Sequence, residues 1–464
     1  MNDLLSNPVL IAVVLMLALS FMRVHVVLSL IISAMVGGLL ADIPAQTLLD
    51  FAHSDATTPT LAMKLQYVSN TFESGIGKGA KVALSYAVLG AFAVAISYSG
   101  LAQALCRFLA GSVKEGPGQA GIRIKWSILL ILLAMSMMSQ NLIPIHIAFI
   151  PLIVPPLLMM MNRLEIDRRM IACVLTFGLV CTYMFLPYGF GAIYLNDILL
   201  TNIQEAGLET HNLSIYQAMG IPALGMFIGL CIAIFISYRK PRHYEDRPIE
   251  GGMPEQAQTK KRDRWIATAT VVIAFLVQIY TDSLMLAALI GFTLFMATRV
   301  IHWSKADAIF NDGIRMMSMI GFIMIAANGF AEVMKMTGGI ETLVNHSALA
   351  FGNSKGLAAL TMLCVGLLIT MGIGSSFSTL PIIIVIYVPL CQQLGFSPLA
   401  TVAIIGTAGA LGDAGSPASD STLGPTMGLN ADGQHDHIRD SVIPTFLHYN
   451  IPLIITGWIA AMAL

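Results

Sequence analysis

Residues 412–425 read GDAGSPASDSTLGP, and this stretch decides how the rest of the chain is interpreted. It contains two carboxylates, Asp413 and Asp420, and follows the apolar run LATVAIIGTAGAL, which suits a membrane helix. Backbone in hydrocarbon has to be helical unless it lines a cavity inside the protein. Pro417 and the glycines indicate that the helix unwinds here, and unwound carbonyls and hydroxyls can bind a cation. A polar loop just outside the membrane is the alternative. Because each ionised Asp at membrane depth costs roughly 2.5–3.5 kcal/mol, two of them favour a transport site.

The composition is that of a membrane protein. Of the 464 residues, 56% are hydrophobic and 11% are charged, and the mean hydropathy is +0.78. Soluble domains carry about 25% charged residues. The chain is therefore predicted to be an all-α polytopic membrane protein. Its six cysteines are scattered through apolar segments without paired spacing, so we expect neither a disulfide framework nor a metal cluster.

The apolar runs predict ten spanning helices and two re-entrant hairpins, with hairpin tips at Gln140-Asn141 and at 374–376. The basic linker 239–264 is placed in the cytoplasm, and the sides alternate along the chain. Most of the 25 Lys and Arg residues then lie on the cytoplasmic side, as the positive-inside rule requires. Each half has about five spans plus one hairpin, and because five is odd the second half is inverted relative to the first.

A weak internal repeat supports this layout. At one constant spacing, seven residues of the first half match identical residues of the second, among them Phe72, Gly75 and Ile76, which match Phe310, Gly313 and Ile314. The predicted division is a first repeat at 1–238 with an extracellular insertion at about 42–71, a solvated linker at 239–264, and a second repeat at 265–464. Inverted repeats with interrupted helices are typical of secondary transporters whose site lies at the membrane midplane.

Polar clusters at the two hairpin tips and the two helix breaks are the candidate site. Sodium prefers hard oxygen ligands, which carboxylates, hydroxyls and freed carbonyls supply. The candidate cation ligands are Asp413, Ser416, Asp420, Ser421, Thr422, Ser375 and Ser376. The candidate substrate-binding residues are Gln140, Asn141, Pro187, Tyr188, Ser378, Thr379 and Pro417. For the tips, polar groups that only cap two helices are the alternative interpretation.

Two further groups of residues each allow two interpretations. Glu332 is a possible proton site, or it pairs with Lys335 three residues later on the same helix face. The run 432–437, DGQHDH, could hold a metal, but a solvated loop is the preferred interpretation.

The motif within residues 412–425 resembles a known family. The bacterial Na+/H+ antiporter family of the NhaC type, within the ion transporter superfamily, carries the pattern Gly-Asp-x-x-Ser-Pro-x-Ser-Asp-[Ser/Thr]-Thr. The residues that match it are Gly412, Asp413, Ser416, Pro417, Ser419, Asp420, Ser421 and Thr422. The tail that follows is similar to the YuiF-type subgroup. The resemblance implies a homodimer with a scaffold and a moving transport domain. The superfamily's dicarboxylate transporters are also similar, but their Ser-Asn-Thr tips are not found at 139–141 or 375–376.

These observations predict a secondary active transporter driven by an ion gradient, most simply a Na+/H+ antiporter. The alternative is a Na+-coupled symporter of an amino acid or small organic anion. Hydrolase, P-loop and Cys-x-x-Cys motifs are missing from the sequence, so an enzyme is not expected. We expect no cofactor and no metal other than Na+, with Na+ or H+ as coupling ions. The expected surroundings are the lipid bilayer of a bacterial inner membrane, without nucleic acid.

Overall fold

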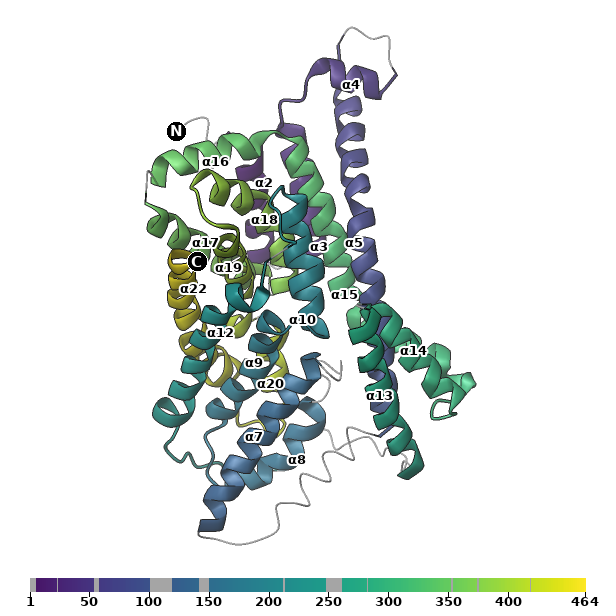
Figure 1. The fold of residues 1–464 in the computed structure, drawn as a ribbon, viewed down its shortest axis with the longest axis vertical. Coiled ribbons are helices and arrows are strands. Elements are labelled where there is room, and N and C mark those ends of the chain that lie inside the picture. Colours follow the sequence, from purple (N-terminus) through teal and green to yellow (C-terminus); the bar gives the residue numbers. More distant parts are fainter. Residues whose placement is uncertain are drawn as a thin grey trace.

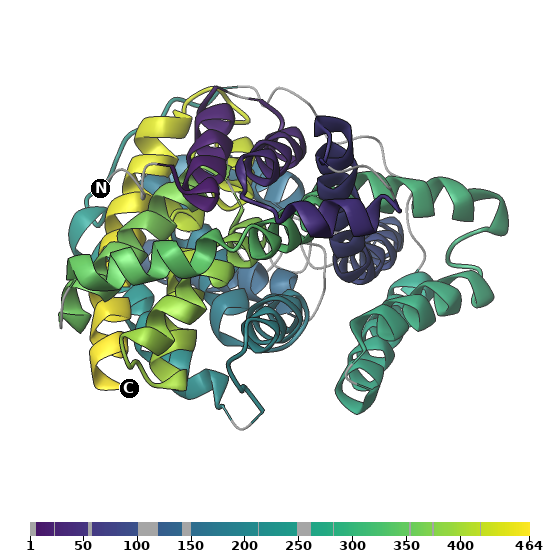
Figure 2. The ribbon, with the colours of Figure 1, turned by 90° about the horizontal axis from the view of Figure 1, so that it is seen from above.

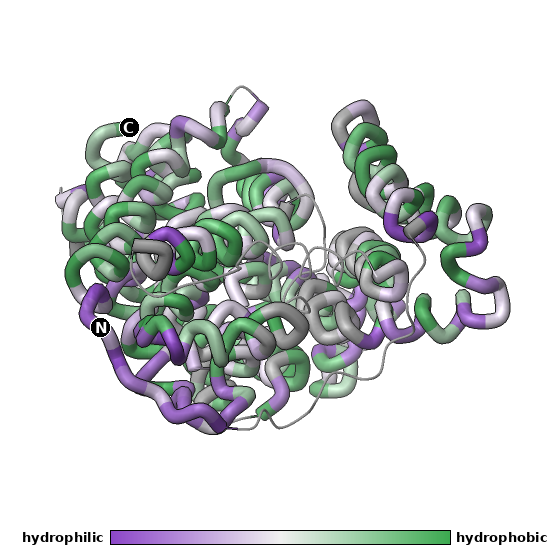
Figure 3. The backbone as a smooth tube through the Cα atoms, turned by 90° about the horizontal axis from the view of Figure 1, so that it is seen from below, coloured by the Kyte–Doolittle hydropathy of each residue, from purple (hydrophilic) through white to green (hydrophobic). Residues whose placement is uncertain are grey.

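The computed structural model describes eleven segments of the chain, 6–22, 24–53, 58–100, 119–141, 150–211, 213–247, 261–281, 283–351, 354–373, 375–417 and 419–464. Within them every regular element is a helix, which confirms the predicted all-α class. Hydrophobic residues run along most of these helices, and hydrophilic ones gather at the connections (Figure 3). Four described helices are long and apolar enough to cross a membrane, or five if one bent pair counts as a single span. The chain is thus a multi-pass membrane protein, and the count of ten spans stays a prediction.

Two long helices, one from each side of the linker, pack along each other at one flank of the molecule (Figures 1 and 2). They are α5 (Leu61–Tyr98) and α15 (Trp303–Met336). Their backbones come so close at Gly75 that a Cβ atom there would clash with the carbonyl of Asn328. Helices α3 (Val26–Leu40) and α14 (Leu284–Ala297) pack on this pair, while α2 (Pro8–Phe21) packs on α3 and α13 (Lys261–Thr281) packs on α14. Figure 2 shows α13 and α14 standing to one side, where α14 contacts α5.

The remaining helices form a bundle around two buried ones, α9 (Arg168–Phe185) and α19 (Pro398–Ala410). Both are apolar on all sides, which is typical of a helix in the middle of a bundle. The helices around them are α7 (Gln119–Asn141), α8 (Ile150–Arg163), α12 (Ile215–Ile232), α17 (Lys355–Ile373), α18 (Ser376–Gln393), α20 (Asp420–Leu429) and α22 (Ile451–Ala463). The short helices α4 (Ala45–Phe51) and α16 (Gly339–Phe351) lie at the end opposite α7 and α8 (Figure 1).

Both predicted helix breaks are present. In the first, α9 ends at Phe185, and the chain resumes as α10 (Phe190–Ala192), a π-helix η2 (Ile193–Leu200) and α11 (Thr201–Glu205). In the second, α19 ends at Ala410, a single 3-10 turn η4 (Asp413–Gly415) follows, and α20 begins at Asp420. The second break is shorter than predicted, because Ser419 caps α20 and the helix then runs through Pro425.

Other boundaries differ from the sequence prediction. Residues 61–71, predicted as part of an extracellular insertion, are the first turns of α5. Most of the linker residues 239–247 are exposed, as in a solvated connector, but Arg242, Tyr244 and Glu245 hydrogen-bond to other segments, and Tyr244 is buried. The solvated loop predicted at 432–437 is wrong at Asp432 and His435, which are buried and hydrogen-bonded. Charge and polarity suggested exposure of these two residues, and pairing between distant segments overrides it.

Candidate functional site

Asp413 is the centre of the candidate site. It lies in the short η4 turn of the second break, and only 6% of its surface is exposed. Its carboxylate accepts hydrogen bonds from three hydroxyls, those of Ser376 (2.7 Å), Tyr183 and Ser419. Among the described residues no Lys, Arg or His pairs with this carboxylate. A buried acid surrounded by neutral oxygen groups leaves its charge available for a cation.

The three hydroxyls come from three different elements. Ser376 begins α18, Tyr183 is in the last turn of α9, and Ser419 caps α20. The hydroxyls of Tyr183 and Ser376 are also 2.6 Å apart, so each can exchange its carboxylate bond for one to the other. The ring of Tyr183 packs on Tyr194 and Phe377, with ring centroids 4.8 and 5.3 Å away. The site therefore forms where both helix breaks meet the second predicted hairpin tip.

The backbone at the second break is held open by a left-handed glycine. Gly412 has φ +87°, which residues with a side chain rarely adopt, and its N–H donates to Asn450 Oδ1 (3.1 Å). Asn450 is fully buried, and its Nδ2 has no hydrogen-bond partner, as is also true of Gln140 Oε1. Buried polar atoms without partners are rare and costly, and at a transport site they mark positions where a cargo or an ion's water can bind.

Ser416, Ser421 and Thr422 shape the break. The Thr422 hydroxyl lies 2.5 Å from the carbonyl oxygen of Ser416, to which it donates. The hydroxyl of Ser416 donates to the Met371 carbonyl (3.3 Å), and the carbonyl of Ser421 accepts from Thr176 (2.8 Å). Through these hydrogen bonds the three predicted cation ligands hold the loop in place.

Asp420 and the residues of the second tip occupy different surroundings. Asp420 is the first residue of α20 and is exposed, and its charge repels that of Asp413. The carbonyl of Ser375 accepts from the Thr379 hydroxyl (3.0 Å), a bond within the first turn of α18. Ser378 also belongs to α18, but its side chain lies outside the described part of the chain.

The predicted residues of the first sequence half are spread out. Gln140 is buried near the end of α7; Asn141 ends that helix, and its side chain lies outside the described residues. Pro187 and Tyr188 lie in the first break, where Tyr188 is 42% exposed. Pro417 is exposed, and its carbonyl oxygen lies 2.9 Å from Nε2 of His437.

Glu332 lies apart from this cluster. It lines a small pocket between α15, α18 and α11, together with Glu205, Asn328 and Lys335. The pocket contains both acidic and basic groups, so pairing with Lys335 and a proton site both remain open.

The sequence prediction included Asp413 and Ser376 but missed two of the groups that complete the site. The sequence motif contains Ser419 without assigning it a role, and the sequence pattern assigns no role to Tyr183. A tyrosine four residues before the helix-breaking Pro187, in an otherwise apolar helix, was the available signal. Asn450 gave no such signal, because its approach to Gly412 depends on the tertiary fold.

Among the described residues there is no cluster of three or more His, Cys, Asp or Glu side chains suited to a transition metal. The oxygen donors around Asp413 fit a hard monovalent cation instead. Such an ion would be cargo or a coupling ion.

Comparison with known proteins gives a consistent result. Profiles described as "Na+/H+ antiporter family" and "Na+-H+ antiporter family" match residues 174–458 and 7–113. The chain is 52% identical over 460 residues to an uncharacterized membrane protein of Vibrio parahaemolyticus, covering 99% of this chain and 100% of that one. It is 49% identical over 402 residues to the putative amino acid transporter YuiF of Bacillus subtilis, covering 85% and 90% of the two chains.

Solved structures of similar fold are transporters. The Alcanivorax borkumensis YdaH transporter matches with a TM-score of 0.58 and 14% identity, covering 98% of each chain. Neisseria gonorrhoeae MtrF, from a class of antimetabolite efflux pumps, matches with the same TM-score and identity, covering 98% of this chain and 94% of that one. At this identity the likeness shows the fold alone. Together with the matching profiles, it makes this chain a transport protein and not an enzyme. The chain belongs to the Na+/H+ antiporter family.

Proposed function

We propose that this protein is a secondary active transporter that exchanges Na+ for H+, with Asp413 as the group that binds either ion. The observation that carries the proposal is a buried carboxylate in a helix break, with three hydroxyls from three elements bonded to it. Each hydroxyl can turn its lone pairs toward a bound cation when its proton finds another acceptor. The Tyr183–Ser376 contact supplies one such alternative.

Competition for one carboxylate explains coupling. Na+ needs the ionised form of Asp413, and a proton removes that charge, so the two ions exclude each other at the site. Exposed Asp420, the residue directly after the cap Ser419, would attract cations toward the break. We place the site near the membrane midplane of a homodimer in the bacterial inner membrane, with the linker in the cytoplasm. The family resemblance and the positive-inside pattern support these assignments.

The test uses purified protein in liposomes carrying a pH-sensitive dye. Asp413→Asn keeps the shape of the side chain and removes its charge, so Na+-driven proton movement should be lost. Sodium should also no longer raise the melting temperature of the detergent-solubilised variant. Asp420→Asn should weaken the response to Na+ without abolishing it. Unchanged Na+-dependent flux in Asp413→Asn would refute the assignment.

A Na+-coupled symporter of an amino acid or small organic anion is the second candidate. The YuiF relative is named a putative amino acid transporter. The unpaired amide atoms of Gln140 and Asn450 could hydrogen-bond a cargo larger than an ion. Uptake of a panel of labelled amino acids, with and without Na+, separates the candidates: Na+-dependent uptake of any one of them favours the symporter.

A further inference from the structure

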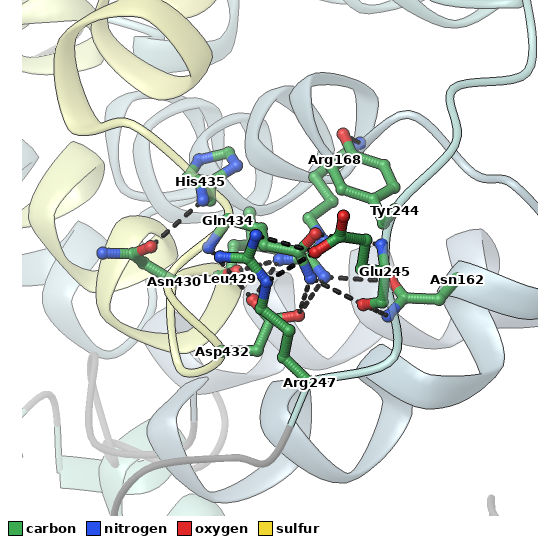
Figure 4. Close-up of polar contacts among 10 residues, drawn as sticks. All are labelled: Asn162, Arg168, Tyr244, Glu245, Arg247, Leu429, Asn430, Asp432, Gln434 and His435. Atoms are coloured by element: carbon green, nitrogen blue, oxygen red, sulfur yellow. Dashed lines mark hydrogen bonds and ion pairs between the residues drawn. The ribbon is translucent and has the colours of Figure 1, made fainter.

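Arg168 is the most tightly held charged side chain in the described structure. Its side chain is completely buried, and its two Nη atoms lie 2.6 and 2.5 Å from the two carboxylate oxygens of Asp432 (Figure 4). Nη1 also donates to the carbonyl of Leu429 (2.8 Å), and Nη2 donates to Asn162 Oδ1 (2.9 Å). The guanidinium stacks on the ring of Tyr244, 4.4 Å from its centroid. Arg168 thereby joins α8, the first part of the linker, and the end of α20.

The linker segment 242–247 completes this cluster from outside. The backbone N–H of Arg168 donates to the Tyr244 hydroxyl (3.1 Å). Glu245 exchanges two bonds with Gln434: its N–H donates to Gln434 Oε1 (2.9 Å), and its carbonyl accepts from Gln434 Nε2 (2.7 Å). Gln434 Nε2 also lies 2.9 Å from Asp432. Figure 4 shows these side chains converging from the linker, α8, α9 and the segment that follows α20.

A buried ion pair is a poor way to gain stability, because desolvation offsets most of the attraction. What the planar guanidinium does provide is geometry, since two parallel bonds to a carboxylate and one to a carbonyl fix the partners in direction as well as distance. Leu429 is the last residue of α20, whose final carbonyls lack partners inside the helix. Arg168 therefore holds the C-terminal end of α20 in one place.

The other end of the same short helix carries the site. Ser419, which caps α20, donates a hydrogen bond to Asp413, and Asp420 is the helix's first residue. A ten-residue helix is rigid and about 15 Å long, so a shift at one end is carried to the other. Gly428 lies so close to Ile150 and Val154 of α8 that a Cβ atom there would have to displace them. The helix is thus seated against α8 beside the end that Arg168 grips.

We propose that Arg168 is a positioning residue for the cation site: it sets the place of α20 and, through it, of Ser419 beside Asp413. This inference rests on the proposed function for its transport consequence, but the positioning of α20 can be measured separately. The linker segment 242–247 covers the cluster and keeps water from the ion pair. Lys cannot replace Arg168, because one ammonium cannot reach both the carboxylate and the helix carbonyl in the required directions.

The experiment compares Arg168→Lys and Asp432→Asn with the matched control Arg169→Lys. Arg169 is the next residue, also pairs with an aspartate (Asp167, 2.7 Å) and stacks on a tyrosine, but its side chain is 36% exposed. Its bonds go to Asp167 and not to α20. Two quantities are measured in purified protein: hydrogen exchange of the α20 amides, and the Na+ concentration that gives half of the maximal thermal stabilisation.

We expect amide exchange in α20 to speed up in Arg168→Lys and Asp432→Asn, and the half-maximal Na+ concentration to rise about tenfold, as for loss of one hydrogen bond to a charged group. The maximal stabilisation at saturating Na+ should be retained, which a merely unfolded protein would not show. Arg169→Lys should match the wild type in both measurements. The positioning role is overturned if both variants exchange α20 amides at the wild-type rate. If the wild type shows no Na+ stabilisation, the proposed function fails, and the exchange comparison still decides the role of Arg168.

Discussion

At the scale of single residues, the hydroxyl of Tyr183 offers the cleanest test of the site. Tyr183→Phe keeps the ring that packs on Tyr194 and Phe377 but removes the donor to Asp413 and Ser376. A hydrogen bond to a charged group contributes about 1.5–3 kcal/mol, so we expect the half-saturating Na+ concentration of transport to rise about tenfold or more.

The matched control for that substitution is Tyr194→Phe. Tyr194 is equally buried, and its hydroxyl donates to the Gly406 carbonyl (2.8 Å) instead of to the carboxylate. Its loss should lower thermal stability without moving the Na+ dependence. Equal shifts of the Na+ dependence in the two variants would contradict a direct role for Tyr183.

His435 predicts how stability depends on pH. Burial lowers the pKa of this histidine to about 4, against about 6.5 in the unfolded chain. The unfolded state therefore binds a proton at a higher pH than the folded state does, and stability that is present above pH ~6.5 is lost as the pH falls toward 4. Between pH 7 and pH 5 we expect a loss of about 2 kcal/mol.

Thermal unfolding of purified protein across this pH range measures that loss. His435→Gln, which can still hydrogen-bond Ser441, should flatten the curve between pH 5 and pH 7. Asp432 also makes stability fall as the pH falls, but at lower pH. Burial of Asp432 opposes its charge, but the Arg168 guanidinium has the larger effect and lowers the pKa of the Asp432 carboxyl. The contribution of Asp432 to stability is therefore lost below pH ~4. An unaltered curve in His435→Gln would show that another group sets the pH dependence.

The limits of sequence reasoning are clear at this scale. Asp413 and Ser376 could be predicted, because an acid beside Pro and Gly in an apolar run, and a run of hydroxyls at a tip, are local patterns. The tyrosine at 183, the amide at 450 and the arginine at 168 could not be assigned. Each meets its partner only through the packing of helices more than 30 residues apart in sequence.

At the scale of elements, α20 shows how a proline is accommodated in a functional helix. Pro425 has no N–H, so the carbonyl of Ser421, four residues earlier, lacks its helical donor. The Thr176 hydroxyl on α9 takes that place at 2.8 Å. Helix α20 is therefore hydrogen-bonded to α9 at the point where its own backbone hydrogen bonding is interrupted.

This tie predicts a double-mutant cycle. Thr176→Val leaves a buried carbonyl unpaired and should destabilise the protein by about 1–3 kcal/mol. In the Pro425→Ala background the new N–H can bond Ser421 itself, so the same Thr176→Val change should cost much less. Chemical or thermal unfolding of the four proteins measures the coupling, and additive effects would show that Thr176 does not replace the missing donor.

Element boundaries were predictable only where local chemistry sets them. Both helix breaks follow from Pro187 and from the left-handed Gly412. The start of α5 at Leu61 did not follow, because residues 61–80 form a helix but are too polar to stand out as an apolar run. The burial of Asp432 and His435 was missed for the opposite reason: polar residues are exposed by default, and only pairing with other segments places these two inside.

At the scale of the whole molecule, the two sequence halves interleave. α5 packs on α15, α9 on α20, and α12 on α22, so each of these contacts joins one helix from before the linker to one from after it. The linker itself adds the hydrogen bonds of Glu245 to Gln434. The two sequence halves therefore do not form separate bodies in space.

We therefore expect the chain to assemble from two co-expressed fragments, 1–250 and 251–464, with a tag on one recovering the other. Two glycines of α5 supply a pair of variants that tests whether its close contact with α15 holds the fragments together. A side chain at Gly75 would collide with the backbone of Asn328, whereas a Cβ atom at Gly77, half a turn along the same helix, meets no atom within 4 Å. Gly75→Leu should abolish co-purification of the fragments, and Gly77→Leu should leave it intact. If Gly75→Leu fragments still co-purify, the α5–α15 contact is not what holds the halves together, and the contacts of α9 with α20 and of α12 with α22 do so instead.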